Sequence, residues 1–203
     1  MKIYSVNDKE FAKYGKVLDL DTKDILKAWE NIEMPEEGSI YKASLDEFEA
    51  LPIKDEIEKQ IFGELDAEIG ICYGHSHALN GLEWHKCSEV NVGLTDLILL
   101  LGDVRELEDG CRYNSKNVKA FKLKKGEAIE VYSTTLHFCP IETSSEGFGC
   151  VVGLTKGTNL PLDNEPADKL LFRKNKWIIA HEDNAALIAR GVVPGIYGEN
   201  YTL

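Results

Sequence analysis

The sequence lacks most signals that place a protein outside the cell or in a membrane. Its five cysteines form no Cys-x-x-Cys pair, and an odd, scattered set argues against a disulfide framework. The most apolar run, residues 97–101, is too short to span a bilayer. Charged residues between Lys2 and Glu10 interrupt any signal-peptide core. We therefore expect a cytoplasmic protein.

Positive charge is also scarce. The chain has 23 Lys and Arg against 35 Asp and Glu, which gives a formal net charge of −12. This charge repels phosphate backbones and anionic lipid head groups, so we expect neither nucleic acid nor membrane as a partner. With 203 residues, of which 43% are apolar and 29% charged, the chain suits one globular domain with a sizeable core.

The residue pattern changes near residue 66. Apolar residues at three- and four-residue spacing predict helices over 23–31, 44–48 and 53–62, which we expect to cover a sheet. Clusters of Gly, Asn, Asp and Ser then divide short β-rich runs. These runs are residues 68–73, 81–93, 95–101, 120–123, 127–132, 136–140 and 149–154. Residues 108–110 and 124–127 predict tight turns, the latter within a hairpin.

This pattern predicts a mainly β fold, an antiparallel sandwich or barrel, in a single domain spanning 1–203. Its parts are a helical N-terminal extension over 1–65, a β core over 67–155, and a C-terminal segment over 156–203. The C-terminal segment mixes turns with one convincing strand, residues 176–181, and is expected to pack on the core.

Residues 82–92 are the most informative segment. If the backbone stays extended, side chains alternate with period two, so Glu83, His85 and Glu89 share one face while apolar residues occupy the other. Two carboxylates and an imidazole on an inward face call for a ligand or a solvent-filled cavity. A divalent metal is the expected ligand, and the alternative is an exposed sheet face paired with lysines.

Residues 81–96 resemble the first motif of the cupin superfamily, His-x-His, three or four residues, then Glu. Glu83 stands in place of the first His, while His85 and Glu89 match the second His and the Glu. The family's fourth ligand is a His on a later strand, and His137 has that position. The resemblance covers residues 67–155 and implies a cupin barrel, a double-stranded β-helix or jelly roll.

The chain departs from this pattern in three places. Its first ligand is Glu, no Pro-x-Gly turn precedes His137, and no Asn follows it. Two carboxylates with two imidazoles make a hard donor set, which favours Mn²⁺ and also accommodates Zn²⁺, Co²⁺ or Fe²⁺. Cys87 would share the ligand face but has no partners for nucleophilic chemistry, so a buried structural cysteine is expected.

The chain is also similar to a family of bacterial cupin-like proteins, DUF4867, in residues 83–102 and 169–177. This similarity implies sugar metabolism and aldose–ketose isomerisation of the sulfoquinovose isomerase type, with the cupin lyxose isomerases as a second analogy. In that reaction a base moves a proton between C1 and C2 through a cis-enediolate. The candidates are His75, His77 and Glu142; alternatively, His75 and His77 are themselves ligands together with His85.

The identity of the substrate stays open, between a neutral monosaccharide and an anionic one. A sulfonate or phosphate group calls for a fixed cation, for which the candidates are Lys86, Arg173, Lys174 and Lys176. Two other functions remain: a metal-dependent cupin lyase of the ureidoglycolate or uronate type, and a sugar-binding cupin without catalysis. A homo-oligomer, dimer or larger, is expected from the sheet edges of small cupins.

Overall fold

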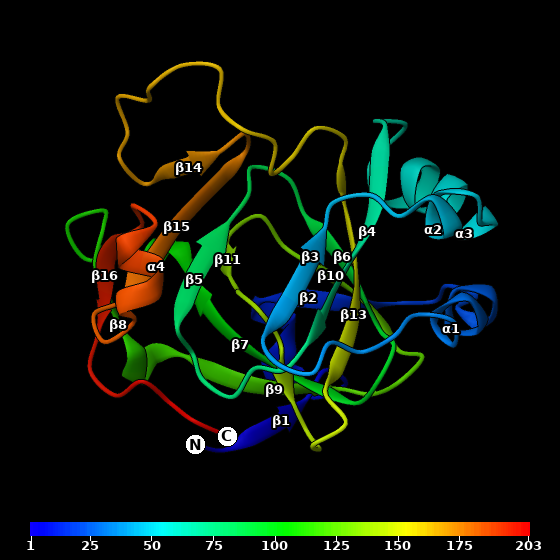
Figure 1. Cartoon of the computed structure of the whole chain (residues 1–203), viewed down its shortest axis with the longest axis horizontal. Helices are drawn as coiled ribbons and strands as arrows, with labels where there is room; N and C mark the ends of the chain where they lie inside the picture. The colour runs from blue at the N-terminus through cyan, green and yellow to red at the C-terminus, as the bar shows by residue number, and fades with distance from the viewer.

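The computed structural model describes residues 1–203 and contains three curled sheets (Figure 1). The first sheet has the order β1-β9-β7-β11, and β12 also pairs with β7. Its strands are β1 (Ile3–Ser5), β7 (Leu97–Asp103), β9 (Lys119–Leu123), β11 (Thr135–Leu136) and β12 (Ile141–Glu142). Only β1 runs parallel to its partner in this sheet.

The second sheet is fully antiparallel and has the order β2-β10-β6-β13-β4-β3. Its strands are β2 (Gly15–Leu18), β3 (Ser39–Lys42), β4 (Ala67–Gly74), β6 (Glu89–Gly93), β10 (Ala128–Val131) and β13 (Phe148–Thr155). The third sheet has the order β14-β15-β16-β8, with β5 on the other edge of β15. It comprises β5 (Gly81–Trp84), β8 (Tyr113–Asn114), β14 (Leu171–Arg173), β15 (Lys176–His181) and β16 (Val193–Tyr197).

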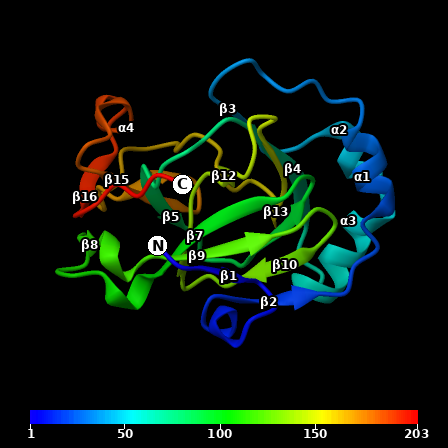
Figure 2. The same ribbon diagram turned by 90° about the horizontal axis from the view of Figure 1, so that it is seen from below.

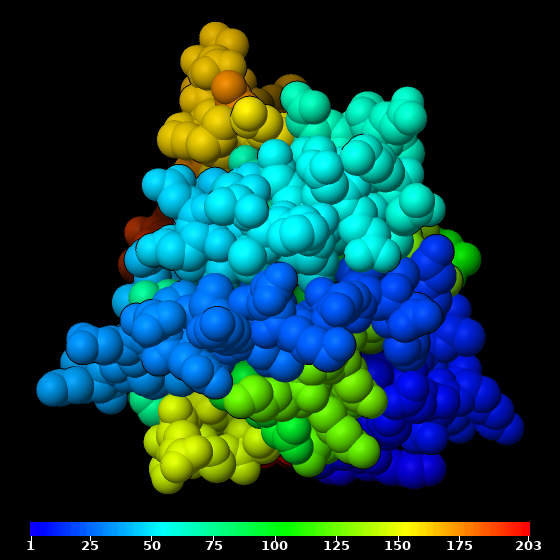
Figure 3. All heavy atoms as spheres, turned by 90° about the vertical axis from the view of Figure 1, so that its right-hand side faces the viewer, coloured from blue at the N-terminus to red at the C-terminus, as the bar shows by residue number.

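Helices cover the outer face of the second sheet, as the sequence predicts. They are α1 (Lys23–Trp29), α2 (Asp46–Glu49) and α3 (Pro52–Glu56), which continues as a π-helical turn over Ile57–Ile61. Apolar side chains such as Ile25 and Phe48 pack there against Ile71 and Val92 of the sheet. Figure 3 shows the N-terminal segment, blue to cyan, covering this face of the molecule. A fourth helix, α4 (Ala185–Ala189), lies beside the third sheet.

The continuous apolar sequence of β7 follows from burial on both faces. Leu97, Leu99 and Leu101 pack into the space between the first and second sheets. Ile98 and Leu100 point the other way, against residues of the third sheet. A strand buried on both sides needs no polar alternation, so β7 is a central element of the core. No helix in the structure has the length and apolar composition needed to cross a bilayer.

Strand β6 alternates in the way that creates a site. Val90 and Val92 face the helices. Glu89 and Asn91, also buried, point into the interior between the sheets and line a cavity there. Because successive side chains of a strand face opposite sides, one strand contributes both to the core and to the polar interior.

Three local predictions are corrected. Residues 1–65 contain strands β1, β2 and β3 as well as helices, so the N-terminal segment extends the first two sheets as edge strands. Residues 81–93 form two strands rather than one. Residues 124–127 form a turn, with Gly126 at φ +85°, but they connect β9 and β10 of different sheets and do not close a hairpin.

The mainly β prediction is confirmed, and the curled sheets are consistent with a cupin-type barrel (Figure 2). The predicted turn at residues 108–110 is present. Asp109 and Gly110 both have positive φ, and Glu108 and Arg112 exchange backbone hydrogen bonds across it. The predicted strand 176–181 is β15, which joins β5 to the rest of the third sheet.

Candidate metal centre

The predicted ligands Glu83, His85 and Glu89 converge, but not by the predicted route. Glu83 lies on β5 of the third sheet and Glu89 begins β6 of the second, while His85 occupies the connecting segment. The prediction of one extended strand is therefore wrong, because the chain changes sheets at residues 85–88. The crossing, rather than strand periodicity, brings the three side chains together.

The fourth predicted ligand is held directly against the first. His137 follows β11 and forms an isolated antiparallel bridge with Glu83. The amide of Glu83 donates to the carbonyl of His137 at 2.6 Å, and the amide of His137 donates back at 3.0 Å. Directly opposed residues of an antiparallel pair project their side chains on the same side. This backbone pairing places Glu83 and His137 side by side.

Donor atoms of Glu83, His85 and His137 all lie within 4.8 Å of one another, close enough to bind one metal ion. Glu89 borders the same group. Its Oε2 atom lies 3.5 Å from Nε2 of His85 and 3.3 Å from Nε2 of His137. Oε1 of Glu83 is 3.8 Å from Nε2 of His85. The four residues thus form one cluster of oxygen and nitrogen donors.

Backbone carbonyls fix the orientation of both imidazoles. Nδ1 of His85 lies 2.8 Å from the carbonyl of Asn175, and Nδ1 of His137 lies 3.1 Å from that of Thr135. A carbonyl only accepts, so each Nδ1 carries the hydrogen and donates it. Both Nε2 atoms are buried and make no hydrogen bond. Two buried imidazole nitrogens without a hydrogen-bond partner, aimed at carboxylates, fit a metal of the expected class.

The charged groups in this cluster strongly shift one another's pKa values. Burial alone would lower the pKa of His137, but the neighbouring Glu89 carboxylate raises it to about 9. Burial would raise the pKa of Glu89, but the nearby imidazoles of His137 and His85 hold it well below its usual value. Asn91 donates a hydrogen bond to the other oxygen of Glu89 at 2.8 Å. Glu89 is therefore an ionised carboxylate in a buried position.

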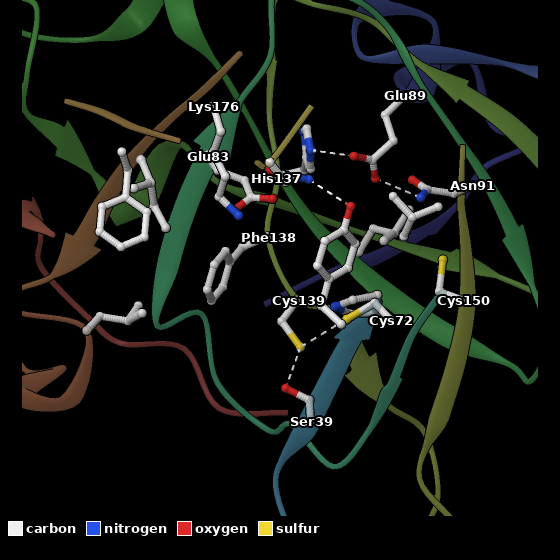
Figure 4. Close-up of a pocket in the computed structure, with 18 of the residues that line it drawn as sticks. Ser39, Cys72, Glu83, Glu89, Asn91, His137, Phe138, Cys139, Cys150 and Lys176 are labelled. Atoms are coloured by element: carbon white, nitrogen blue, oxygen red, sulfur yellow. Dashed lines mark hydrogen bonds and ion pairs between the residues drawn. The ribbon is translucent and has the colours of Figure 1, made fainter. Parts of the chain in front are cut away.

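A cavity of about 390 Å³ opens onto the cluster and is lined by Glu83, Glu89 and His137 (Figure 4). Its volume lies within the range of small-molecule sites. Phe138 and Ile178 contribute apolar lining, and Asn91 and Asn159 contribute amides. A mostly apolar wall with a few convergent polar groups is typical of a binding site for a small polar molecule.

Of the four cations predicted to contact substrate, only Lys176 lines this cavity. It forms a close ion pair with Oε2 of Glu83, and both side chains are largely buried. The other three have different positions. Lys86 lies 4.9 Å over the Trp177 ring, Arg173 packs on Phe172, and Lys174 pairs with Asp163 at 2.8 Å. Sequence spacing along the β14–β15 turn did not show which of these residues points inward.

The predicted proton carriers also lie elsewhere. Glu142 accepts from Nδ1 of His75 at 2.7 Å and lies 3.3 Å from Nδ1 of His77, so the three form a cluster of their own. None of them lines the cavity. Neither His75 nor His77 belongs to the group of donor atoms that contains His85, so the alternative in which they bind a metal together with His85 finds no support in the geometry. Cys87 is turned away from the ligands toward Thr155 and Asn175.

Two cavity residues were missed by sequence reasoning. Arg190 is the C-cap residue of α4 and makes no ion pair. Tyr41 lies on the edge strand β3, and its hydroxyl accepts a hydrogen bond from Asn159 at 2.8 Å. Tyr41 is partly exposed, but desolvation raises the pKa of its hydroxyl above the usual value, so the hydroxyl stays protonated. No motif connects these residues to the ligand segment, and only the fold brings them to it.

The fold and this site define a mainly β protein with a candidate metal centre inside its barrel. Residues 3–201 match the family model described as "Domain of unknown function (DUF4867)". The match spans nearly the whole chain, so the protein belongs to the DUF4867 family. No curated protein matches the sequence.

Solved structures of Bacillus subtilis oxalate decarboxylase resemble the fold distantly. The structure of that enzyme at pH 4.6 has 11% sequence identity and a TM-score of 0.36, and the alignment covers 63% of this chain and 28% of the decarboxylase. A mutant of the same enzyme gives 11% identity, a TM-score of 0.35, and coverage of 61% and 27%. The alignment thus spans little more than a quarter of the decarboxylase chain. A likeness at this level carries no argument about activity.

Proposed function

We propose that the protein is a metal-dependent aldose–ketose isomerase acting on a monosaccharide or on an anionic, sulfonated or phosphorylated, sugar. The observation that carries the proposal is the convergence of Glu83, His85, Glu89 and His137 beside a cavity that all but His85 line, with both imidazole Nε2 atoms left without hydrogen bonds. The choice of reaction rests on the resemblance to sugar isomerases that the sequence indicates.

Glu83, His85, Glu89 and His137 would hold the ion, and Mn²⁺ suits this hard set of two carboxylates and two imidazoles best. When bound, a divalent cation supplies Lewis acidity that stabilises negative charge on the substrate oxygens. The ring orientations are set in advance by the carbonyls of Asn175 and Thr135, and Asn91 orients Glu89. Preset donors need no rearrangement when substrate enters, which is how a site stabilises a charged transition state.

Proton transfer needs groups that face the cavity, and we assign it to Lys176 and Tyr41 in place of His75, His77 and Glu142. The ammonium group of Lys176, paired with Glu83, can deliver a proton to a developing oxyanion. Tyr41 keeps its phenolic hydrogen and can donate a hydrogen bond to a sugar hydroxyl. The carboxylate of Glu83, which contacts both Lys176 and His85, is the proton acceptor that we assign within the cavity wall.

An anionic substituent on the sugar would meet Arg190. The positive charge of Lys176 is balanced by its ion pair with Glu83. Arg190, in contrast, lines the cavity, is exposed, and has no ion-pair partner. A guanidinium binds sulfonate or phosphate oxygens in a bidentate manner. Arg190 therefore takes the role that the sequence assigned to Lys86, Arg173 and Lys174.

The test is an NMR screen of aldoses, with sulfoquinovose among them, in D₂O with Mn²⁺ supplied. Ketose formation with deuterium entering at the transferred position is the expected result. A new carbonyl or alkene product would replace the isomerase with a lyase. Saturable sugar binding with no exchange on any sugar would establish a binding protein instead.

A further inference from the structure

Two cysteine side chains meet in the wall of the cavity. Sγ of Cys72 and Sγ of Cys139 are 3.9 Å apart, and both residues line the cavity that contains Glu83 and His137 (Figure 4). Cys72 lies on β4, and Cys139 lies between β11 and β12. The two come from distant parts of the chain, so the contact is made by the fold and not by sequence proximity.

The surroundings favour this pair over other pairings of the thiols. Cys72 and Cys139 are each partly exposed, and the cavity gives small molecules access to both. Cys150 stands opposite Cys72 in the β4–β13 register, but it is fully buried and its thiol donates to the carbonyl of Val151. Cys87 and Cys111 line no part of the cavity.

The two sulfurs can approach further. A disulfide bond needs a separation of about 2.05 Å, so the gap must close by nearly 2 Å. Cys139 lies in an irregular segment, with no regular strand between Leu136 and Ile141. The thiol of Cys139 makes hydrogen-bonding contacts only with the thiol of Cys72 and, at 3.4 Å, with the hydroxyl of Ser39. A small movement of this segment brings the sulfurs into bonding distance.

We propose that Cys72 and Cys139 are a peroxide-sensitive dithiol that closes reversibly to a disulfide in the cavity wall. Hydrogen peroxide oxidises one thiol to a sulfenic acid with release of one water. The second thiol then attacks the sulfenic sulfur, which forms the S–S bond and releases a second water. Two thiols and one peroxide thus give one disulfide and two waters.

Closure has a consequence for the metal centre, which rests on the proposed function. Cys139 is two residues beyond His137, so drawing its sulfur toward β4 moves the segment that carries this ligand. We expect the oxidised protein to hold metal less tightly than the reduced protein. Reduction by a dithiol reagent restores the original affinity.

The experiment treats the intact wild-type protein with equimolar hydrogen peroxide, alkylates free thiols, and maps peptides without reduction. Two of the five thiols are expected to be lost and to appear in a peptide that links Cys72 to Cys139. A Cys72→Ser or Cys139→Ser variant should lose this cross-link, whereas the matched control Cys111→Ser keeps it.

Retention of all five free thiols, or a cross-link between Cys72 and Cys150 instead, would overturn the proposal. Mapping of the wild-type chain does not depend on whether the variants fold. Metal content is measured on the same oxidised samples. A mapped Cys72–Cys139 disulfide with unchanged metal content would support the peroxide-sensitive dithiol. It would contradict only the proposed effect of the disulfide on metal binding.

Discussion

Glu83 and His137 are direct partners across an antiparallel bridge, each amide donating to the carbonyl of the other. This backbone pairing ties the first segment of ligands to the last. It fixes the separation of a carboxylate and an imidazole before any metal arrives, because rigid pairing preorganises the donors. The site's geometry is therefore a property of the fold, and its chemistry can be tested one residue at a time.

Lys176→Met should abolish most turnover while metal stays bound. The change removes the ammonium that faces Glu83 and the proton it supplies, and loss of a proton-transfer group costs about 10²–10⁴-fold in rate. Steady-state kinetics with metal analysis on the same sample measures both effects. Lys176→Arg, which keeps the ion pair, should recover part of kcat. Unchanged kcat in Lys176→Met would remove this residue from the mechanism.

Asn175 should control metal affinity without touching the metal. Its carbonyl accepts from His85, its side chain contacts the Lys86 amide and the Cys87 thiol, and its φ of +56° is left-handed. Asn175→Gly preserves the backbone conformation, whereas Asn175→Ala adds a strain of about 1 kcal/mol. Both variants keep the carbonyl but lose the side-chain hydrogen bonds that position it, so metal binding should weaken by about 10-fold, and Ala should be the less stable of the two by denaturant titration. Wild-type metal affinity in both variants would contradict this role.

The ionised Asp103 carboxylate should make the free energy of unfolding fall as the pH becomes acidic. Hydrogen bonds from Arg105 lower its pKa to about 2, against burial, which raises it. A carboxyl with a lowered folded pKa stabilises above its unfolded pKa of about 3.9, and this contribution is lost as pH falls toward 2. The shift corresponds to about 2–3 kcal/mol, and screening around the exposed Arg105 reduces it to about 1 kcal/mol.

The Asp103→Asn variant tests this contribution. Denaturant unfolding should show the variant less stable than wild type by about 1 kcal/mol at pH 7, with the gap shrinking by pH 3. Asp163→Asn is the matched control, because Asp163 is an exposed partner of Lys174. An equal gap at both pH values would show that the Asp103 charge contributes nothing.

His75→Ala and His77→Ala test the proton carriers that the sequence predicts. Both residues share Glu142 and lie outside the cavity lining, so turnover in either variant should stay within about twofold of wild type. A loss of kcat comparable to that of Lys176→Met would show that the catalytic base lies in the cluster of His75, His77 and Glu142. Steady-state kinetics under identical metal loading decides between the two positions.

The ligand types and their segments were predictable from sequence because chemistry constrains them locally. Glu83, His85 and Glu89 stand within seven residues, and buried polar residues among apolar neighbours indicate a site. The mainly β fold was predictable for the same reason, since short β-rich runs and turn residues are local signals. The helices over residues 23–62 followed from apolar spacing that burial on the second sheet requires.

The cavity wall could not be predicted in this way. Arg190 and Tyr41 reach the cavity from α4 and β3, and nothing in their local sequence distinguishes them from surface residues. The break at residues 85–88 was missed because a change of sheet leaves the polar and apolar alternation unaltered on both sides. Lys174 and Lys176 are two residues apart, and only the geometry of the β14–β15 turn determines that Lys176 points into the cavity while Lys174 pairs with Asp163.

Metal content is the most direct test of the central claim that four residues form one metal centre. Elemental analysis of protein purified without added metal, and again after Mn²⁺ is supplied, should give about one ion per chain in wild type and in His75→Ala. Alanine at Glu83, His85, Glu89 or His137 should each remove most of it. Stoichiometric metal in all four variants would falsify the centre described here.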